Sequence, residues 1–114
     1  MDSCIFCNIA EGTVPVRKIY EDADMVAFYD AQPQAPVHSL VIPRRHIATI
    51  METNEEDVEL LGKLLFKAQQ LAVELGCEEK GARFVINCKE YGGQTVDHLH
   101  IHILGGRPFD WPPG

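Results

Sequence analysis

Three histidines alternate with apolar residues near the end of the chain, in the segment His98-Leu99-His100-Ile101-His102-Ile103-Leu104. Successive side chains of a β-strand point to opposite faces, so the apolar residues are expected to face the core and the imidazoles to share the other face. Imidazole titrates near neutral pH, can attack as a nucleophile and can donate or accept a proton. The segment therefore predicts a strand over residues 98–104 that carries a catalytic row of histidines.

Two other interpretations of this row remain open. One is a polar sheet face that happens to be rich in histidine, although the chain has only five histidines and three of them alternate strictly here. The other is a three-histidine metal site, which some hydrolases have. A strand rises about 3.3 Å per residue, which would separate His98 from His102 by roughly 13 Å. That distance is too long for all three rings to bind one ion.

A glycine pair precedes the histidine row, in the sequence Tyr91-Gly92-Gly93-Gln94-Thr95. Glycine permits unusual backbone angles, so consecutive N–H groups can converge on an anion, and the Thr95 hydroxyl can add a donor. Most glycine pairs are plain turns, but one placed just before a histidine row fits a phosphate cradle. Together the two segments indicate attack by an imidazole on phosphorus.

A second group of metal-ligating residues begins with Cys4 and Cys7, which are three residues apart on an expected helix. Cys-x-x-Cys is a common half of a zinc site, and His46 and His98 are the candidates for the two further ligands. Four nitrogen and sulfur ligands leave no open position, so such an ion would be structural. A redox pair and two buried thiols without metal are the alternatives, although the βαβ context of a redox motif is not evident.

Two helices are expected to position these groups. A short one is predicted over 4–10, capped by Ser3 and ended by Gly12. A long one begins with the capping-box pair Thr53 and Glu56 and ends at Gly76. Its expected buried face recurs at spacings of three and four and consists of Val58, Leu61, Leu65, Ala68, Ala72 and Leu75.

Short apolar runs predict four strands, over 25–29, 38–42, 83–87 and 98–104, with a proline-rich loop over 30–36 and a proline-rich tail over 107–114. We therefore predict an α+β fold: an antiparallel sheet of about five strands, with one long helix across it and a short N-terminal helix. The length of 114 residues and the lack of an internal repeat or linker predict a single domain, 1–114.

Charge and composition exclude several partners. The net charge of −7 leaves no basic surface for nucleic acid, although a small anion could still bind in a local pocket. No apolar run reaches the roughly 18–20 residues of a membrane helix, and the sequence Met1-Asp2-Ser3-Cys4 does not resemble a signal peptide. A reducing, cytoplasmic location is therefore expected, with Cys77 and Cys88 as small apolar core residues.

The histidine row resembles the His-φ-His-φ-His-φ-φ signature of the histidine triad (HIT) family, in which φ is apolar. The segments 28–30, 36–43 and Trp111-Pro112-Pro113-Gly114 are similar to its Hint branch, the purine nucleoside phosphoramidases, and the similarity extends from Ile5 to the C-terminus. The resemblance implies a homodimer with one continuous sheet. Some members of the wider family hold a structural zinc with residues corresponding to Cys4, Cys7, His46 and His98, and the chemistry itself requires no cofactor.

The resemblance also implies the reaction. His100 would attack the α-phosphorus of a nucleoside 5′-phosphoramidate, forming a nucleotidyl-histidine that water converts to AMP or GMP after the amine has left. His102 would hydrogen-bond the phosphate and the leaving group, and His38 would orient His100 and relay its proton. The remaining implied substrate contacts are Asp30 to the ribose, the loop residues Asn87, Gly93, Gln94 and Thr95 to the phosphate, with Thr95 assisting catalysis, and Ile5, Phe6, Ile9, Val14 and Phe28 to the base.

Two rival functions stay open beside the phosphoramidase. A dinucleoside polyphosphate hydrolase of the same superfamily would use the same nucleophile with a different leaving group. The non-enzymatic alternative is a nucleotide-binding sensor or scaffold, in which turnover is incidental. The complete histidine row and Thr95 favour an enzyme, and the Trp-Pro-Pro-Gly ending favours the phosphoramidase.

Overall fold

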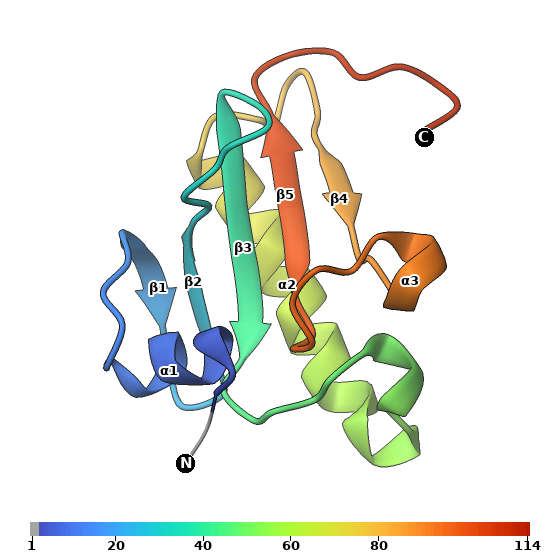
Figure 1. Cartoon of the computed structure of the whole chain (residues 1–114). Coiled ribbons are helices and arrows are strands. Elements are labelled where there is room, and N and C mark those ends of the chain that lie inside the picture. The colour runs from blue at the N-terminus through green and yellow to red at the C-terminus, as the bar shows by residue number, and fades with distance from the viewer. Residues whose placement is uncertain (1–2) are drawn as a thin grey trace.

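A five-stranded antiparallel sheet crosses the molecule, with the strand order β1-β2-β3-β5-β4 (Figure 1). The computed structural model describes residues 3–114, so Met1 and Asp2, which entered the signal-peptide prediction, lie outside the described residues. The strands are β1 (Lys18–Glu21), β2 (Met25–Tyr29), β3 (Val37–Pro43), β4 (Arg83–Val85) and β5 (Ile101–Gly105). The expected α+β fold with about five antiparallel strands is thereby confirmed.

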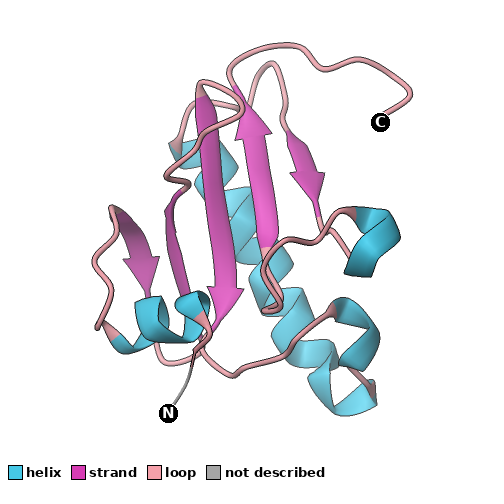
Figure 2. Cartoon of the chain, in the orientation of Figure 1, coloured by secondary structure: helices cyan, strands magenta, loops and turns pink. Residues whose placement is uncertain are grey.

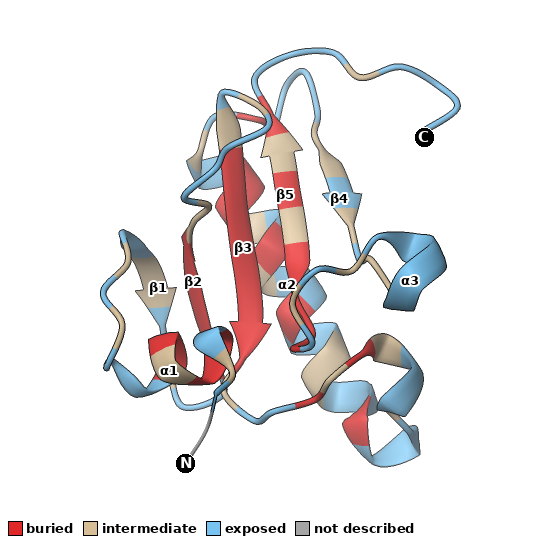
Figure 3. Ribbon diagram, viewed as in Figure 1, coloured by how far each residue is buried: buried red, intermediate tan, exposed pale blue. Residues whose placement is uncertain are grey.

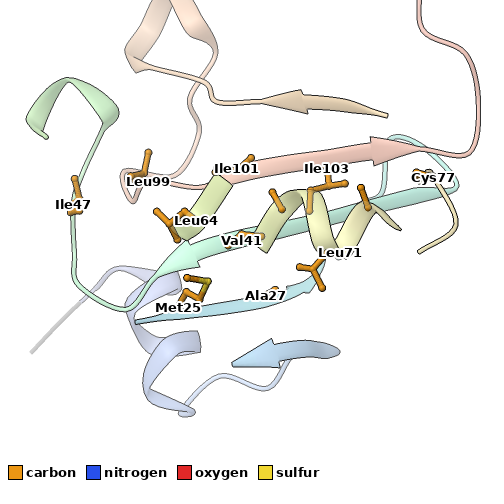
Figure 4. Packing of buried hydrophobic residues seen from close by; sticks show 12 residues of the cluster. Met25, Ala27, Val41, Ile47, Leu64, Leu71, Cys77, Leu99, Ile101 and Ile103 are labelled. Atoms are coloured by element: carbon orange, nitrogen blue, oxygen red, sulfur yellow. The ribbon is translucent and has the colours of Figure 1, made fainter. Parts of the chain in front are cut away.

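Helices lie against both faces of this sheet (Figure 2). The long helix α2 (Val58–Glu74) packs across β3 and β5. The short helix α1 (Ile5–Glu11) lies on the opposite face and packs against β2 and β3. Two hydrophobic clusters result, one on each face of the sheet, and Figure 4 shows the larger one, between the sheet and α2.

Alternation along β3 and β5 sorts their side chains between these two faces. Val41 and Ile101 are paired across the two strands and belong to the cluster under α2. Leu40 and His102, the next pair along, point to the face of α1. Figure 3 shows β3 as mostly buried, because it is covered on both faces and lies between β2 and β5. The centre of the sheet thus presents histidines to α1 and aliphatic residues to α2.

The N-terminal helix begins with a different cap from the one expected. Cys4, and not Ser3, is the N-cap, and its Sγ accepts a hydrogen bond from the N–H of Cys7 at 3.3 Å. Gly12 ends the helix in the left-handed conformation, as predicted. The first cysteine therefore combines a place in the N-terminal Cys-x-x-Cys with the role of helix cap.

The long helix also starts and packs differently from the prediction. The capping box is formed by Asn54 and Asp57 around a single 3-10 turn (Glu55–Asp57), because the hydroxyl of Thr53 donates instead to the carbonyl of Ile50. The buried positions are Leu64, Ala68, Leu71 and Ala72. Ala68, Ala72 and the partly buried Leu61 were expected on this face, whereas Val58 and Leu65 are 63% and 55% exposed.

The segments around the histidine row depart further from the sequence pattern. β5 begins at Ile101, so the first three residues of the expected strand over 98–104 are irregular. β4 is two residues shorter than expected, and a short helix, α3 (Lys89–Gly92), occupies part of the expected turn. The late start of β5 is taken up with His98 below, and the left-handed Gly93 ends α3.

Cys77 is buried in the larger core as predicted, whereas Cys88 is half-buried and its Sγ lies 3.0 Å from Oγ1 of Thr49. Within residues 3–114, none of the helices combines the length and the apolar character that a membrane crossing requires.

Candidate active site

His100 is held by the main chain in one orientation. Its Nδ1 lies 2.7 Å from the carbonyl oxygen of His98. Because a carbonyl can only accept, Nδ1 carries the proton and Nε2 keeps its lone pair. The ring is also packed edge-on against Phe6, with centroids 5.1 Å apart. The middle histidine therefore presents an unprotonated nitrogen, the form of imidazole that can act as a nucleophile.

His98 lies in the irregular segment before β5 and has other partners. Its Nε2 lies 2.8 Å from the carbonyl oxygen of Pro43, so this nitrogen is the donor. Its Nδ1 lies 3.3 Å from Sγ of Cys4 and 3.5 Å from Sγ of Cys7. The ring is fully buried, and the N–H groups of His98 and Leu99 donate to the carbonyls of Val96 and Ile47, which keeps these two residues out of the β5 ladder. The three histidines therefore do not form one row as predicted.

His102 and His38 form a pair across β5 and β3. Nε2 of His38 lies 2.9 Å from Nδ1 of His102 and 3.4 Å from Oδ2 of Asp30. Nδ1 of His38 accepts the backbone N–H of Gln34 at 2.9 Å. The ring of His102 is also close to that of His100, with centroids 4.9 Å apart. His38 thus contacts His102, and not His100 as expected, while the His98 carbonyl orients His100.

All three of these rings are held in the neutral form. Burial lowers the pKa of His102 to about 4, with further lowering by His100 and His38 and an opposing effect of Asp30. Burial also lowers the pKa of His100, against the hydrogen bond to His98 and the charge of Asp30, which raise it. The pKa of His38 is lowered by burial as well, opposed by Asp30. At neutral pH the site therefore offers lone pairs and neutral N–H donors.

These histidines open into a cavity of about 820 Å³, which we call the triad cavity. Its volume is within the range of small-molecule sites. Its lining combines apolar side chains with the imidazoles, Thr95 and Asp30. The lining residues are Ile5, Phe6, Ile9, Val14, Pro15, Val16, Phe28, Tyr29, Asp30, Ala31, Gln32, Gln34, His38, Leu40, Thr95, Val96, His100 and His102.

The triad cavity collects most of the side chains that the sequence singled out, but three loop residues are missing from its lining. The side chain of Asn87 donates to the carbonyl of Gly92 at 2.6 Å. Gln94 donates to the carbonyls of Ala48 and Val96. Gly93 serves as the C-cap of α3. In the described chain these residues shape the loop before the histidines, and Thr95 is the one of the four loop residues expected to contact phosphate that lines the cavity.

The four expected metal ligands meet in one cluster, Cys4–Cys7–His46–His98, with ligand atoms within 4.8 Å of one another. Nδ1 of His46 lies 3.2 Å from Sγ of Cys7. With tetrahedral angles and ordinary Zn–S and Zn–N bonds, a sulfur and a nitrogen ligand should be about 3.5 Å apart. The observed separations of 3.2, 3.3 and 3.5 Å therefore fit a tetrahedral site. The donor set suits zinc and leaves no open position.

Sequence reasoning missed the main-chain groups that set the histidine tautomers. The carbonyls of Pro43 and His98 and the N–H of Gln34 fix which ring nitrogen carries the proton. The proline-rich composition of 30–36 was a signal for a rigid loop, but the residue types do not show which peptide group faces His38.

Known proteins of similar sequence and structure carry the same fold. The family model described as "HIT domain" matches residues 11–109. A HIT family hydrolase from Legionella pneumophila has 49% sequence identity and a TM-score of 0.96, and the match covers 98% of this chain and all of that chain. The match to the histidine triad nucleotide-binding protein of Candida albicans has 31% identity and a TM-score of 0.82, covering 96% of this chain and 83% of that one.

A zinc-bound histidine triad family protein from Mycobacterium smegmatis is also similar, with 32% identity, a TM-score of 0.78, and coverage of 96% of this chain and 78% of that one. The fold, the paired histidines and these matches together define a class of small α+β proteins built around a histidine motif. The chain belongs to the histidine triad family.

Proposed function

We propose that this protein hydrolyses nucleoside 5′-phosphoramidates, as expected of the Hint branch, through a covalent intermediate on His100. The observation that carries the proposal is the hydrogen bond from Nδ1 of His100 to the carbonyl of His98, since it leaves Nε2 as a nucleophile beside the triad cavity. The similarity to a HIT family hydrolase and to a histidine triad nucleotide-binding protein supports a nucleotide substrate.

The chemistry proceeds in two displacements at phosphorus. Nε2 of His100 attacks the α-phosphorus, the P–N bond breaks, and the leaving nitrogen takes a proton from Nε2 of His102 and departs as the amine. Water then attacks the nucleotidyl-histidine and gives its proton back to Nε2 of His102, which releases the nucleoside monophosphate and restores both neutral imidazoles. An N–H of His102 and the hydroxyl of Thr95 would bind the phosphoryl oxygens as charge develops. The apolar residues from α1 and Phe28 form a slot for a flat base, and Asp30 can accept hydrogen bonds from ribose hydroxyls.

The charge of the cavity favours a phosphoramidate over a dinucleoside polyphosphate. Among the residues described, neither lysine nor arginine lines the triad cavity, and Asp30 is acidic. A polyphosphate chain carries several negative charges, and sites for such groups ordinarily use arginine or lysine. A monoanionic phosphoramidate can instead be held by neutral N–H and O–H donors.

We also infer that the Cys4–Cys7–His46–His98 cluster binds one zinc ion. The ion would join the N-terminal cysteines to the segments that precede α2 and β5, and it would have no role in the chemical steps. The tetrahedral spacing described above and the zinc-bound relative from M. smegmatis support this assignment.

Homodimer formation is supported by the side of the molecule around β4, which is an edge strand. A small apolar pocket there is lined by residues of α2, β5 and the segment after β4, and the exposed Leu65 and Ile86 border it. An exposed apolar surface of this kind is typical of protein interfaces. Leu65→Glu should convert a dimer of about twice 12.8 kDa into monomers by light scattering, and a wild-type monomer would contradict the interface.

Trapping with a nucleoside phosphoramidate labelled in the nucleoside tests the whole proposal. We expect protein denatured in alkali, which preserves the P–N bond of the intermediate, to carry label on the peptide that contains His100, and the product to be a nucleoside monophosphate. His100→Ala should lower turnover by about 10⁴-fold or more while AMP still binds. Label on another residue, or undiminished turnover in His100→Ala, would refute the mechanism. If the protein cleaves a dinucleoside polyphosphate faster than a nucleoside phosphoramidate, the substrate is a polyphosphate and the proposed substrate class is wrong.

A further inference from the structure

A second group of metal-ligating side chains lies in the triad cavity. Asp30, His38 and His102 each place one ligand atom within 4.8 Å of the other two. Two imidazoles and one carboxylate are the donor set of many transition-metal sites. The separation of 2.9 Å between the two imidazole nitrogens and that of 3.4 Å between nitrogen and carboxylate would suit ligands on one ion. Side-chain types and distances alone therefore indicate a metal site here.

The backbone of the preceding loop contradicts that interpretation. An imidazole that binds metal through one nitrogen ordinarily carries a proton on the other and donates it to a carbonyl or carboxylate. In His38 the other nitrogen, Nδ1, faces the N–H of Gln34 at 2.9 Å and must accept. The proton of the neutral ring is therefore on Nε2, which points at His102 and Asp30. A metal ion at Nε2 would have to displace this proton or break the contact to Gln34.

The same contact sets the direction of the whole hydrogen-bond chain. Nε2–H of His38 donates to Nδ1 of His102, so the proton of a neutral His102 is on its own Nε2. His102 then has a donor on the side away from His38, beside the ring of His100. A single backbone N–H thus fixes the proton positions of two rings.

The loop that presents this N–H is held from several directions. The N–H of Gln32 donates to Oδ1 of Asp30 at 2.8 Å, and the guanidinium of Arg107 donates to the carbonyl of Gln34 at 3.1 Å. Gly106 packs so closely on Pro36 that a Cβ at position 106 would lie 2.7 Å from the proline ring. Residue Gln34 is therefore held on both sides: its N–H bonds His38, and its carbonyl, in the next peptide group, bonds Arg107 from the segment after β5.

We infer that the peptide N–H of Gln34 is a positioning group that holds His38 as the Nε2–H tautomer, directs His102 as a donor to the substrate phosphate, and keeps divalent metal ions out of the Asp30–His38–His102 cluster. The role in phosphate binding rests on the proposed function, whereas the tautomer and the exclusion of metal do not.

Nitrogen-15 NMR of the histidine rings tests the tautomer directly in the unmodified, zinc-loaded protein. Long-range proton–nitrogen correlations distinguish a ring protonated on Nε2 from one protonated on Nδ1. We expect His38 and His102 as Nε2–H tautomers and His100 as the Nδ1–H tautomer. His38 protonated on Nδ1, or exchanging between both forms, would overturn the inference whatever the activity of the protein.

A pair of variants at one position isolates the N–H from the side chain. Gln34→Pro removes the backbone donor, and Gln34→Ala keeps it while removing the same side chain. For a nucleoside phosphoramidate we expect kcat of Gln34→Pro to be about 10-fold or more below that of Gln34→Ala, with similar KM. Equal kcat in the two variants would overturn the inference. Should Gln34→Pro not fold, Arg107→Met releases the carbonyl of Gln34 and loosens the residue that presents the N–H, and a mixed His38 tautomer is expected in its NMR spectrum.

Cobalt(II) titration of zinc-loaded protein tests the exclusion of metal. We expect no second ion to bind to Gln34→Ala, whereas Gln34→Pro gains a cobalt site with visible absorption that Asp30→Asn removes again. A second cobalt ion that binds equally to both position-34 variants and is lost with Asp30→Asn would show that the cluster is a metal site after all. An inactive wild-type protein would refute the proposed function but would leave the NMR and cobalt results valid.

Discussion

Two histidine clusters lie on opposite sides of His100, and they differ in what holds the far nitrogen of the ring. In the Cys4–Cys7–His46–His98 cluster, Nε2–H of His98 donates to the carbonyl of Pro43, so Nδ1 keeps a lone pair toward the sulfurs. In the Asp30–His38–His102 cluster, Nδ1 of His38 accepts from the N–H of Gln34, so Nε2 carries a proton. The first arrangement prepares a ligand, and the second prepares a donor.

The difference teaches that the main chain decides what an imidazole can do. Both clusters contain enough ligand atoms within 4.8 Å to hold an ion. When one ring nitrogen donates to a main-chain carbonyl, the other keeps its lone pair and can bind a metal or attack. When one ring nitrogen accepts from a main-chain N–H, the other carries the proton and is a donor. The same reasoning assigns His100 as the nucleophile, because its far nitrogen also faces a carbonyl.

The largest effect that separates the clusters is expected from removal of a cysteine ligand. Cys7→Ser should abolish stoichiometric zinc binding and lower the free energy of unfolding by about 3 kcal/mol, because loss of a metal ligand is among the strongly destabilising changes. Metal analysis and thermal denaturation measure both effects. The pH dependence of any remaining turnover should keep its shape, since His38 and His102 are in the other cluster.

Cys88→Ser provides the matched control. This cysteine is outside the zinc cluster, and a serine hydroxyl can keep the contact with Thr49. It should retain one zinc per chain and nearly all of the stability. Equal zinc content in Cys7→Ser and Cys88→Ser would show that the first cluster is not a metal site, and the contrast between the clusters would disappear.

A smaller effect is expected from acid, through the neutral rings of the second cluster. An unfolded imidazole takes up a proton near its ordinary pKa of about 6.5, whereas His102 in the folded protein has a pKa of about 4. Between these values the unfolded state binds more protons, so the free energy of unfolding decreases as the pH falls through this window and is independent of His102 above it. Urea denaturation at several pH values should show a shallower decrease for His102→Gln than for the wild type. Parallel curves would contradict the lowered pKa.

The sequence pattern was sufficient for the fold and for bringing most of the candidate site residues together. Strand β2, the end of α1 at Gly12 and most of β3 were predicted from local residues. His46 and Cys7 were placed in one metal site although they are far apart in the chain, and their side chains meet at 3.2 Å. These features follow from residue types, periodicity and motif resemblance, which a sequence displays directly.

The remaining features depend on competition between hydrogen bonds, which residue types do not resolve. Thr53 was predicted as the N-cap. Its hydroxyl donates to the carbonyl of Ile50, and the neighbouring Asn54 is the N-cap residue of the capping box. Ideal alternation predicted His98 as the first residue of a strand, whereas it lies in the irregular segment before β5, with its ring between the Pro43 carbonyl and the two cysteine sulfurs. On α2, Leu65 is exposed because the sheet contacts the neighbouring stripe of the helix.

The smallest predicted effect concerns the loop just before His98. The side chain of Gln94 bonds three main-chain groups: the carbonyls of Ala48 and Val96 and the N–H of Lys89. Because these bonds hold the chain just before His98, Gln94→Ala should lower the free energy of unfolding by about 1 kcal/mol, the ordinary cost of lost hydrogen bonds. Turnover should fall less than tenfold with KM little changed, measured beside Gln94→Glu, which keeps the acceptor for Lys89. A large rise in KM without loss of stability would instead make Gln94 a substrate ligand and would place the loop in the catalytic cluster.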